Sequence, residues 1–339
     1  MAQGQRLLVV TEDNAQLGAI QATAELPELP ANVALTKRES QLLIAGDQIA
    51  SEPPDRNDYL HTVMCQVGLP RKATDARTFE RQSGHISISL EAGRLYNGRE
   101  WVDQPLPFGT TPRLVMVHIS SEAIRTQSRK VEVGDSMRQF MQMLGIGDGG
   151  GPRGGYTQVR RQIEALAVCK LSIGMQSEGR VVTVDSKPFK RFDAWLHQDG
   201  SQRTLWPGVM ELSTDFYETL AEHAVPLDYR ALSALKHSAL SLDIYTWLAH
   251  RLCRINKPSG VMLSWQNLRD QFGQEYAESR DFKWEFRRAL RQVQVVYATA
   301  RVAEIAGGLH LYPSPAPIQR TLVRGAEASV AVDNSGEVE

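Results

Sequence analysis

The sequence predicts an α+β protein that contains two copies of one unit, each made of three helices followed by a pair of strands. The stretch 133–145 (VGDSMRQFMQMLG) aligns without a gap to 261–273 (VMLSWQNLRDQFG), at an offset of 128 residues. Two unrelated amphipathic stretches would also share some apolar periodicity, but the gap-free register and the matched glycines favour a duplication. The matched start and stop residues are Ser136 with Ser264 and Gly145 with Gly273.

Each element of the first copy has its own sequence signal. Thr111-Pro112 places a capping residue and a proline at the start of a first helix, and Ser136 can cap the second. The glycine-rich stretch 145–155 is interpreted as a flexible turn before a third helix, Tyr156–Leu171. The strands KLSIGMQ and VVTV follow, joined by SEGR. Upstream, HISISLEAG alternates as a strand does, and Asn97-Gly98 is a preferred hairpin turn.

Strand-like stretches and helices connect the two copies. FKRFDAWL and GVMELS are typical of strands, and STDFYETLAEHAVPLD predicts a short helix stopped by Pro226. A long helix, broken near Ser238, is predicted from Asp228 to about Ile255. The second copy then has a helix capped by Ser264, a basic third helix, and two strands that meet at the Gly-Gly pair after Ala306, a strong hairpin signal.

This order of elements is that of a winged helix, a compact module whose last helix enters the major groove of DNA. The predicted fold is therefore two tandem winged-helix domains, each with a helix-turn-helix and a β-hairpin wing, between flexible acidic ends. The predicted divisions are an N-terminal segment 1–57, a first domain 58–204, a linker helix with a second domain 205–318, and a tail 319–339.

The charge is unevenly distributed along the chain. The 339 residues have a net charge of −1, but residues 1–60 carry four basic and nine acidic side chains, and residues 321–339 carry one and four. The residues between them therefore carry a net charge of +7. A basic body between acidic ends suggests a polyanionic partner such as nucleic acid. No run of about 18 apolar residues is present, so no membrane span is expected.

The stretch 280–297 (RDFKWEFRRALRQVQVVY) carries the main candidate site. Its apolar residues recur with helical spacing on one face, while Lys283, Arg287 and Arg291, spaced by four, form a stripe on another. Arginine can bind guanine bidentately, and both arginine and lysine neutralise phosphates. The alternatives are a merely solvated face and a core-facing Trp284. The residues predicted to bind DNA here are Arg280, Lys283, Trp284, Arg287, Arg288, Arg291 and, on the wing, Arg301.

The third helix of the first copy is less basic. Arg160 and Arg161 lie on it and Arg153 precedes it, but Glu164 dilutes the charge. We expect these arginines to contact the DNA backbone or few bases, with a share in a dimer interface as the alternative. The glycine cluster 145–155 lacks the Lys-Ser or Lys-Thr of a phosphate-binding loop, so no nucleotide cofactor is expected.

No catalytic or metal-binding pattern is found in the sequence. The eight histidines include no pair separated by one residue, which a rolling-circle nickase needs for its metal ion. No G-x-S-x-G motif or Cys/His dyad is present. Cys65, Cys169 and Cys253 are widely spaced and are interpreted as reduced thiols of a cytoplasmic protein. We expect no enzyme activity, no cofactor and no metal.

Four segments resemble the plasmid-encoded RepA family of replication initiators. They are LPFGTTPRLVM (106–116), GDSMRQFMQMLGI (134–146), FYETLAEHAVPLDYRAL (216–232) and ALSLDIYTWLAHRL (239–252). The resemblance covers roughly residues 57–313. It implies a protein that binds repeated sequences (iterons) at a plasmid origin as double-stranded DNA and helps to open that origin. It also implies recruitment of the host initiator and helicase, and a monomer–dimer equilibrium that restrains copy number.

The predicted function is sequence-specific binding of origin DNA by a bacterial cytoplasmic protein associated with its plasmid. A dimeric winged-helix repressor that binds an inverted repeat is the first alternative. A DNA-nicking enzyme, which acts on DNA ends, is the second. Tandem direct repeats beside the gene would favour initiation, and a palindrome would favour repression.

Overall fold

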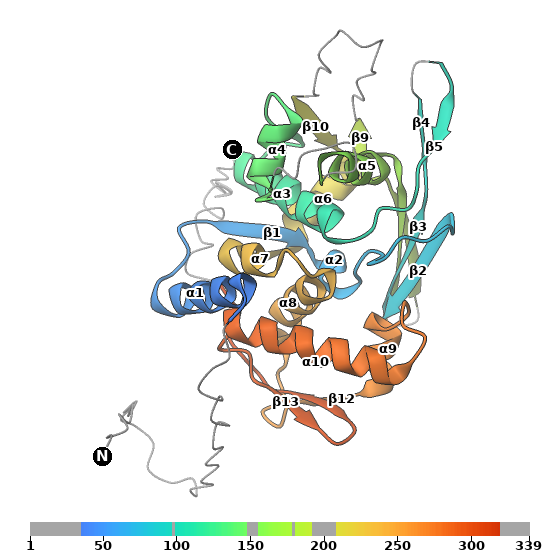
Figure 1. Cartoon of the computed structure of the whole chain (residues 1–339). Coiled ribbons are helices and arrows are strands. Elements are labelled where there is room, and N and C mark those ends of the chain that lie inside the picture. Colours follow the sequence, from blue (N-terminus) through green and yellow to red (C-terminus); the bar gives the residue numbers. More distant parts are fainter. Residues whose placement is uncertain (1–34, 97–98, 148–154, 178–179, 192–207, 319–339) are drawn as a thin grey trace, which may run out of the picture. The chain divides into compact units, whose positions relative to one another are not determined.

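Helices and small antiparallel sheets alternate along the chain in the computed structural model (Figure 1). The structure describes residues 35–96, 99–147, 155–177, 180–191 and 208–318. Every strand pairing within these ranges is antiparallel, and together with the helices this confirms the predicted α+β class. The predicted boundary between residues 204 and 205 lies outside the described residues, so the division into two domains stays a prediction.

The first predicted copy, called here the first unit, contains the expected three helices. Ser136 caps the second of them as predicted, because its side chain accepts a hydrogen bond from the Gln139 N–H. The predicted cap at Thr111 is wrong: the first helix starts one residue earlier, after Gly109, whose φ of 82° favours glycine. The elements are α3 (Thr110–Thr126), β6 (Lys130–Glu132), α4 (Met137–Met143), α5 (Gly155–Val168), β7 (Lys170–Ser177) and β8 (Arg180–Ser186).

The strands of the first unit belong to two different sheets. Strand β7 pairs with β8 and with β3 (Ile86–Glu91), which pairs with β2 (Thr78–Ser83), so the sheet order is β2-β3-β7-β8. Strand β6 instead pairs with β10 (Val209–Leu212), next to β9 (Phe189–Arg191). Strand β6 therefore does not extend the β7–β8 hairpin into a three-stranded sheet. A separate hairpin contains β4 (Arg94–Tyr96) and β5 (Trp101–Asp103).

The connection between the units pairs with a segment from near the start of the described chain. Strand β1 (Asn57–His61) is antiparallel to β11 (Ala224–Asp228), and Pro226, which was predicted to stop the preceding helix, lies in β11. The predicted break at Ser238 is confirmed, because its side chain caps the following helix by accepting a hydrogen bond from the Ser241 N–H. The helices of this region are α2 (Thr62–Gln66), α6 (Thr214–His223) and α7 (Tyr229–Leu235).

The second predicted copy, called here the second unit, has the predicted order of helices and strands. Helix α9 begins at Trp265, 128 residues after α4 begins at Met137, which is the offset found in the sequence. Strands β12, β14 and β13 form one antiparallel sheet in that order. The elements are α8 (Ala239–Arg251), the 3₁₀ helix η1 (Leu252–Arg254), β12 (Val261–Ser264), α9 (Trp265–Phe272), α10 (Ser279–Val296), β13 (Val302–Ile305) and β14 (Gly308–Leu311).

The two matched glycines end their helices differently. Gly145 follows α4 with a φ of 65°, in the left-handed region that was predicted. Gly273 after α9 has a φ of −108°, so the predicted left-handed conformation is wrong there. Its glycine is needed for space instead, because a Cβ atom would lie 2.8 Å from the Arg269 carbonyl oxygen.

Helix α1 (Lys37–Ser51) was not predicted. It lies within the segment 1–57, which was expected to lack a long helix, and it packs against α7 and α10. A Cβ atom at Gly46 would lie 2.6 Å from the Val295 carbonyl oxygen, so glycine permits the close approach to α10. Arg230 donates hydrogen bonds to the carbonyl oxygens of Gln48 and Glu52, at 3.2 and 2.9 Å, and so caps the end of α1.

Both units contribute to one hydrophobic core within the described residues. Ile119 and Phe140 of the first unit and Tyr245 and Phe286 of the second are fully buried in it. Shared burial of this kind holds α3 and α8 against each other. No helix in the described part of the chain is both long enough and apolar enough to cross a membrane.

Candidate nucleic-acid interface

Helix α10 is amphipathic, and its buried face agrees with the prediction. The aromatic rings of Phe282 and Phe286 are fully buried against Trp265 and Phe272 of α9, with ring centroids 5.6–6.5 Å apart. These contacts attach α10 firmly to the helix before it. The predicted core residues of α10, all buried, are Phe282, Phe286, Ala289, Leu290 and Val293.

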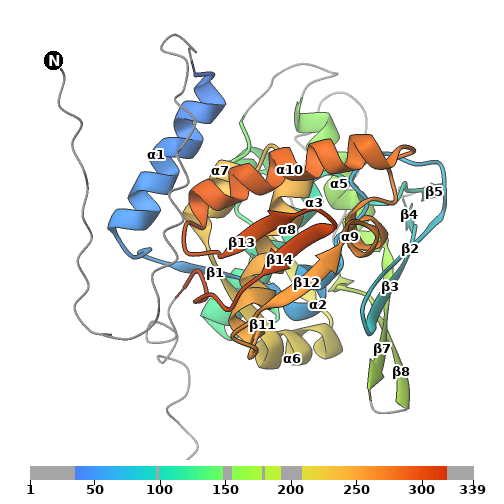
Figure 2. The same cartoon turned by 90° about the horizontal axis from the view of Figure 1, so that it is seen from below.

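The opposite side of α10 carries the predicted basic residues (Figure 2). Arg280, Trp284, Arg288 and Arg291 are exposed, while Lys283 and Arg287 are half-buried. The alternative of a core-facing Trp284 is therefore wrong, since its exposure is 57%. The stripe thus faces away from the core along the length of the helix.

Arg287 is held at the centre of this face by two neighbours. Its Nε donates to Glu304 Oε1 at 2.8 Å and to Oε2 at 3.0 Å, and a second guanidinium nitrogen donates to Oε1 at 2.5 Å. Its guanidinium also lies 4.9 Å from the ring centroid of Trp265. The hydrogen bond from Glu304, which lies on β13, raises the pKa of Arg287. The wing and α9 therefore fix the orientation of this arginine.

The remaining cations of α10 are held more loosely. Arg288 forms an ion pair of 2.9 Å with Glu285 and lies over the Trp284 ring. Arg280 is 92% exposed and is 3.7 Å from Asp281. Exposed pairs of this kind contribute little to stability and exchange readily for other anions. The side chain of Arg291 has no hydrogen bond or ion pair with another described residue.

Arg301 lies next to the wing, immediately before β13. Its side chain is exposed, and the guanidinium lies 5.4 Å from the ring centroid of Tyr312. Its backbone N–H donates to Ser314 Oγ at 2.9 Å, so the residue is fixed at the sheet edge. The guanidinium is free to contact an external anion.

The first unit does not present an equal surface. Arg160 donates to Glu164 at 2.7 Å on its own helix, α5, and is largely buried. Arg161 on the same helix is exposed. Arg153 lies outside the described residues. As predicted from Glu164, the charge on α5 is partly neutralised.

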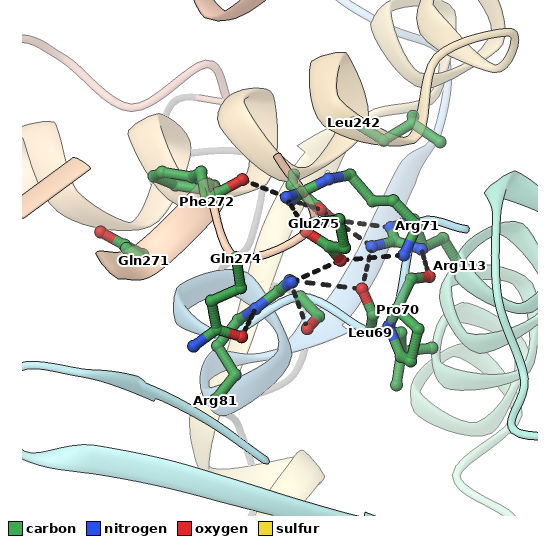
Figure 3. Close-up of polar contacts among 12 residues, drawn as sticks. Leu69, Pro70, Arg71, Arg81, Arg113, Leu242, Gln271, Phe272, Gln274 and Glu275 are labelled. Atoms are coloured by element: carbon green, nitrogen blue, oxygen red, sulfur yellow. Dashed lines mark hydrogen bonds and ion pairs between the residues drawn. The ribbon is translucent and has the colours of Figure 1, made fainter. Parts of the chain in front are cut away.

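A buried ionic network at the junction of the two units was missed by sequence reasoning (Figure 3). Arg113 of α3 binds Asp243 of α8 bidentately, at 2.7 and 2.8 Å. Arg71 binds both Asp243 and Glu275, and Arg81 donates to Glu275 at 2.6 Å. The partners are more than 100 residues apart in the chain, so no local pattern reveals them.

The network affects the ionisation of its members. Burial lowers the pKa of Arg81 to about 10, and the nearby Arg71 adds to this shift. Burial alone would raise the pKa of Asp243, but Arg113 and Arg71 hold it below its usual value. A carboxylate surrounded by guanidinium groups stays charged, so the network remains ionic.

The sequence profile described as "Plasmid encoded RepA protein" matches residues 106–267. Residues 106–267 match the plasmid RepA family. All four segments that carried the resemblance lie inside this range, so the resemblance is confirmed. The RepA match ends within α9, before α10 begins, and is shorter than the predicted span of 57–313. The basic face of α10 is therefore a feature of this chain that lies beyond the matched RepA segment.

Two crystal structures are similar to this chain. The first, of selenomethionine derivatives of domains 2 and 3 of RctB, has a TM-score of 0.46 and 14% sequence identity, and covers 74% of this chain and 95% of that chain. The second, of RctB domains 2–3, has a TM-score of 0.44 and 12% identity, and covers 74% and 96%. No curated protein matches the chain.

Proposed function

We propose that this protein is a plasmid replication initiator that binds direct repeats (iterons) at its origin sequence-specifically and opens the adjacent duplex without breaking a covalent bond. The match of residues 106–267 to plasmid RepA supports a role in initiation. The outward basic face of α10, built on a helix-turn-helix with a β13–β14 hairpin beside it, is the observation that carries DNA binding.

In this proposal the second unit is a winged helix whose α10 enters the major groove. Arg287 is suited to read a base because Glu304 and Trp265 restrict its rotamers before DNA arrives, which reduces the entropy lost on binding. Lys283 and Arg291, four residues to either side on the same stripe, would contact the flanking phosphates. Arg301 would contact a phosphate beside the wing.

The first unit is proposed to contact the same duplex through α5. Arg161 is exposed for this role, whereas Arg160 would have to leave Glu164. Two reading helices on one chain would enter successive major grooves about 34 Å apart and cover about 20 base pairs. Bending the duplex between them would cost on the order of 1–6 kcal/mol, offset by protein contacts.

The proposal also includes partners and location. A monomer–dimer equilibrium, copy-number control and contacts with the host initiator and helicase are properties of the RepA resemblance, and we propose that they apply here. The protein would act in the bacterial cytoplasm on its own plasmid.

A mobility-shift assay with the full chain tests the proposal. One duplex carries the direct repeats beside the gene and the other has the same base composition in shuffled order. We expect binding to the repeats about 10³-fold tighter or more at physiological salt. Equal affinity for both duplexes would contradict sequence-specific binding, and preference for a palindrome bound by a dimer would favour a repressor.

A second assay separates opening from cleavage. Supercoiled origin DNA is incubated with the protein and magnesium or manganese, and then probed for unpaired thymines and for nicks. Unpaired bases beside the repeats in covalently closed DNA are expected. Relaxed, nicked circles would identify an enzyme instead.

A further inference from the structure

A polar groove lies between α9 and the turn that joins β2 to β3. Its volume is about 790 Å³. The turn of Ser83 and Gly84 forms one wall, α9 and the turn after it form the other, and Arg251 contributes from the end of α8. Amide groups can donate hydrogen bonds to phosphate oxygens. The amide side chains that line the groove are Gln82, Gln266, Asn267, Gln271 and Gln274.

Arg251 is an uncompensated cation in this groove. Its Nε is buried and has no hydrogen-bond partner among the described residues. Burial lowers its pKa, and no nearby carboxylate opposes that effect. Arg113 and Arg81, by contrast, are each paired with a carboxylate. Because a half-buried guanidinium without a counter-charge is unfavourable, an anion from outside would stabilise it.

The other charged groups of the lining are already engaged. Asp270 accepts a hydrogen bond from Gln266 at 2.7 Å, and Arg269 donates to the Ala277 carbonyl oxygen at 2.9 Å. No carboxylate of the groove lining is therefore directed at Arg251. An anion that enters would meet one unpaired guanidinium and several amide donors.

The junction network holds the two walls of the groove in place (Figure 3). Arg81 of β2 donates to Glu275 at 2.6 Å and to the Gln274 amide oxygen at 3.4 Å, on the opposite wall. Gln271 of α9 donates to the Gln66 carbonyl oxygen at 2.8 Å. The groove is thus bounded by a buried and fully ionic support, and its width is set before any ligand binds.

The groove also adjoins the proposed reading helix. Gly273, Gln274 and Tyr276, which line it, lie in the turn that connects α9 to α10. A duplex seated on α10 would bring its backbone towards α9, because the helix before a reading helix crosses the DNA backbone. Duplex DNA is therefore the source of phosphate that the position favours.

We propose that this groove is a second part of the DNA interface, where Arg251 binds a backbone phosphate and the lining amides support it. The proposal depends on the proposed function for the identity of the duplex. It predicts affinity without base discrimination, because a phosphate contact carries no sequence information.

The test compares Arg251→Gln with wild type in the full chain, by fluorescence anisotropy on the repeat duplex and the shuffled duplex between 50 and 200 mM salt (concentrations of the order over which phosphate contacts are lost). Loss of one phosphate contact should lower the salt slope by about one and weaken both duplexes by the same factor. The matched control is Arg254→Gln, which removes the same charge three residues on; Arg254 is exposed and bonded to the His250 carbonyl oxygen.

A second variant guards against an unfolded Arg251→Gln protein. Gln82→Glu adds a carboxylate at the exposed rim of the groove with almost no change of shape, and should weaken both duplexes. The proposal is overturned if both groove variants fold and bind like wild type, or if Arg254→Gln changes binding as much as Arg251→Gln.

The outcomes also separate this proposal from the function. Unchanged Arg251→Gln binding together with continued preference for the repeats would sink the groove and leave the initiator proposal standing. Equal wild-type binding to both duplexes, with a salt slope that falls in Arg251→Gln, would remove the initiator proposal and keep the groove.

Discussion

In the second unit, strand β12 joins β14 and β13 beside α10, whereas in the first unit β6 pairs with β10 and leaves the β7–β8 hairpin to join β3. The helices keep the same order and the same 128-residue offset. The strands that would form a wing have been recruited into different sheets. Only the second unit therefore has a complete three-stranded sheet next to its last helix.

The equivalent arginines of the two units show the functional consequence. The stretch VRRQI (159–163) aligns with FRRAL (286–290), so Arg160 corresponds to Arg287. Arg160 is paired with Glu164 on its own helix. Arg287 is paired with Glu304 on the wing, which orients it between wing and helix. We infer that a duplicated scaffold has kept one strong reading surface and one weaker one.

The junction network provides the largest expected effect. Asp243→Ala leaves Arg113 and Arg71 without their shared carboxylate and should lower the free energy of unfolding by about 3–5 kcal/mol, because buried guanidinium groups lose their partner. Urea denaturation measures it. Asp281→Ala, at an exposed position, should change stability by less than about 0.5 kcal/mol. Similar small losses in both variants would show that the two units do not depend on this link.

The cores of the two last helices should differ in the next prediction. Phe286→Ala removes a fully buried ring and should cost about 3–5 kcal/mol. Val159→Ala, the equivalent change in α5, removes a smaller buried side chain and should cost less. Thermal and urea unfolding of both variants checks the order. A larger loss for Val159→Ala would reverse the view that α10 is the more firmly seated helix.

The DNA surfaces are compared by Arg287→Ala and Arg160→Ala. Loss of a base contact by Arg287 should weaken binding to the repeats by about 1–3 kcal/mol and relax specificity. Arg160→Ala should leave specificity unchanged and at most lower the salt slope by about one. Anisotropy titrations with the repeat and shuffled duplexes measure both. Equal loss of specificity in the two variants would mean that both units read bases.

The smallest effect is expected for Glu304→Gln. Removing the exposed pair with Arg287 should change folding stability by about 0–1 kcal/mol. Binding to the shuffled duplex should become tighter, since a carboxylate has been removed from the interface, while the ratio between repeat and shuffled duplex falls. A rise of that ratio would show that Glu304 does not orient Arg287.

Local periodicity was sufficient to predict α10. The spacing of Phe282, Phe286 and Val293 places them on one face, and all three are buried. Serine caps at Ser136 and Ser264 were equally local and were confirmed. These features depend only on neighbours within a few residues, so one sequence is enough to reveal them.

Features that depend on distant partners were missed. The pairing of β6 with β10 joins segments about 80 residues apart, and the network around Asp243 and Glu275 uses arginines at positions far earlier in the chain. Helix α1 was missed because acidic and proline residues around it masked a helix that is stabilised by packing on α7 and α10. Tertiary contacts, which one sequence does not display, determine all three.

Footprinting on the origin region, with wild type and the combined variant Lys283→Ala, Arg287→Ala and Arg291→Ala, tests the central role of α10 most directly. Wild type should protect a series of direct repeats with about ten base pairs between contacts on successive grooves. The combined variant, folded by circular dichroism, should lose this pattern. Identical protection by the two proteins would contradict the assignment of α10 as the helix that reads DNA.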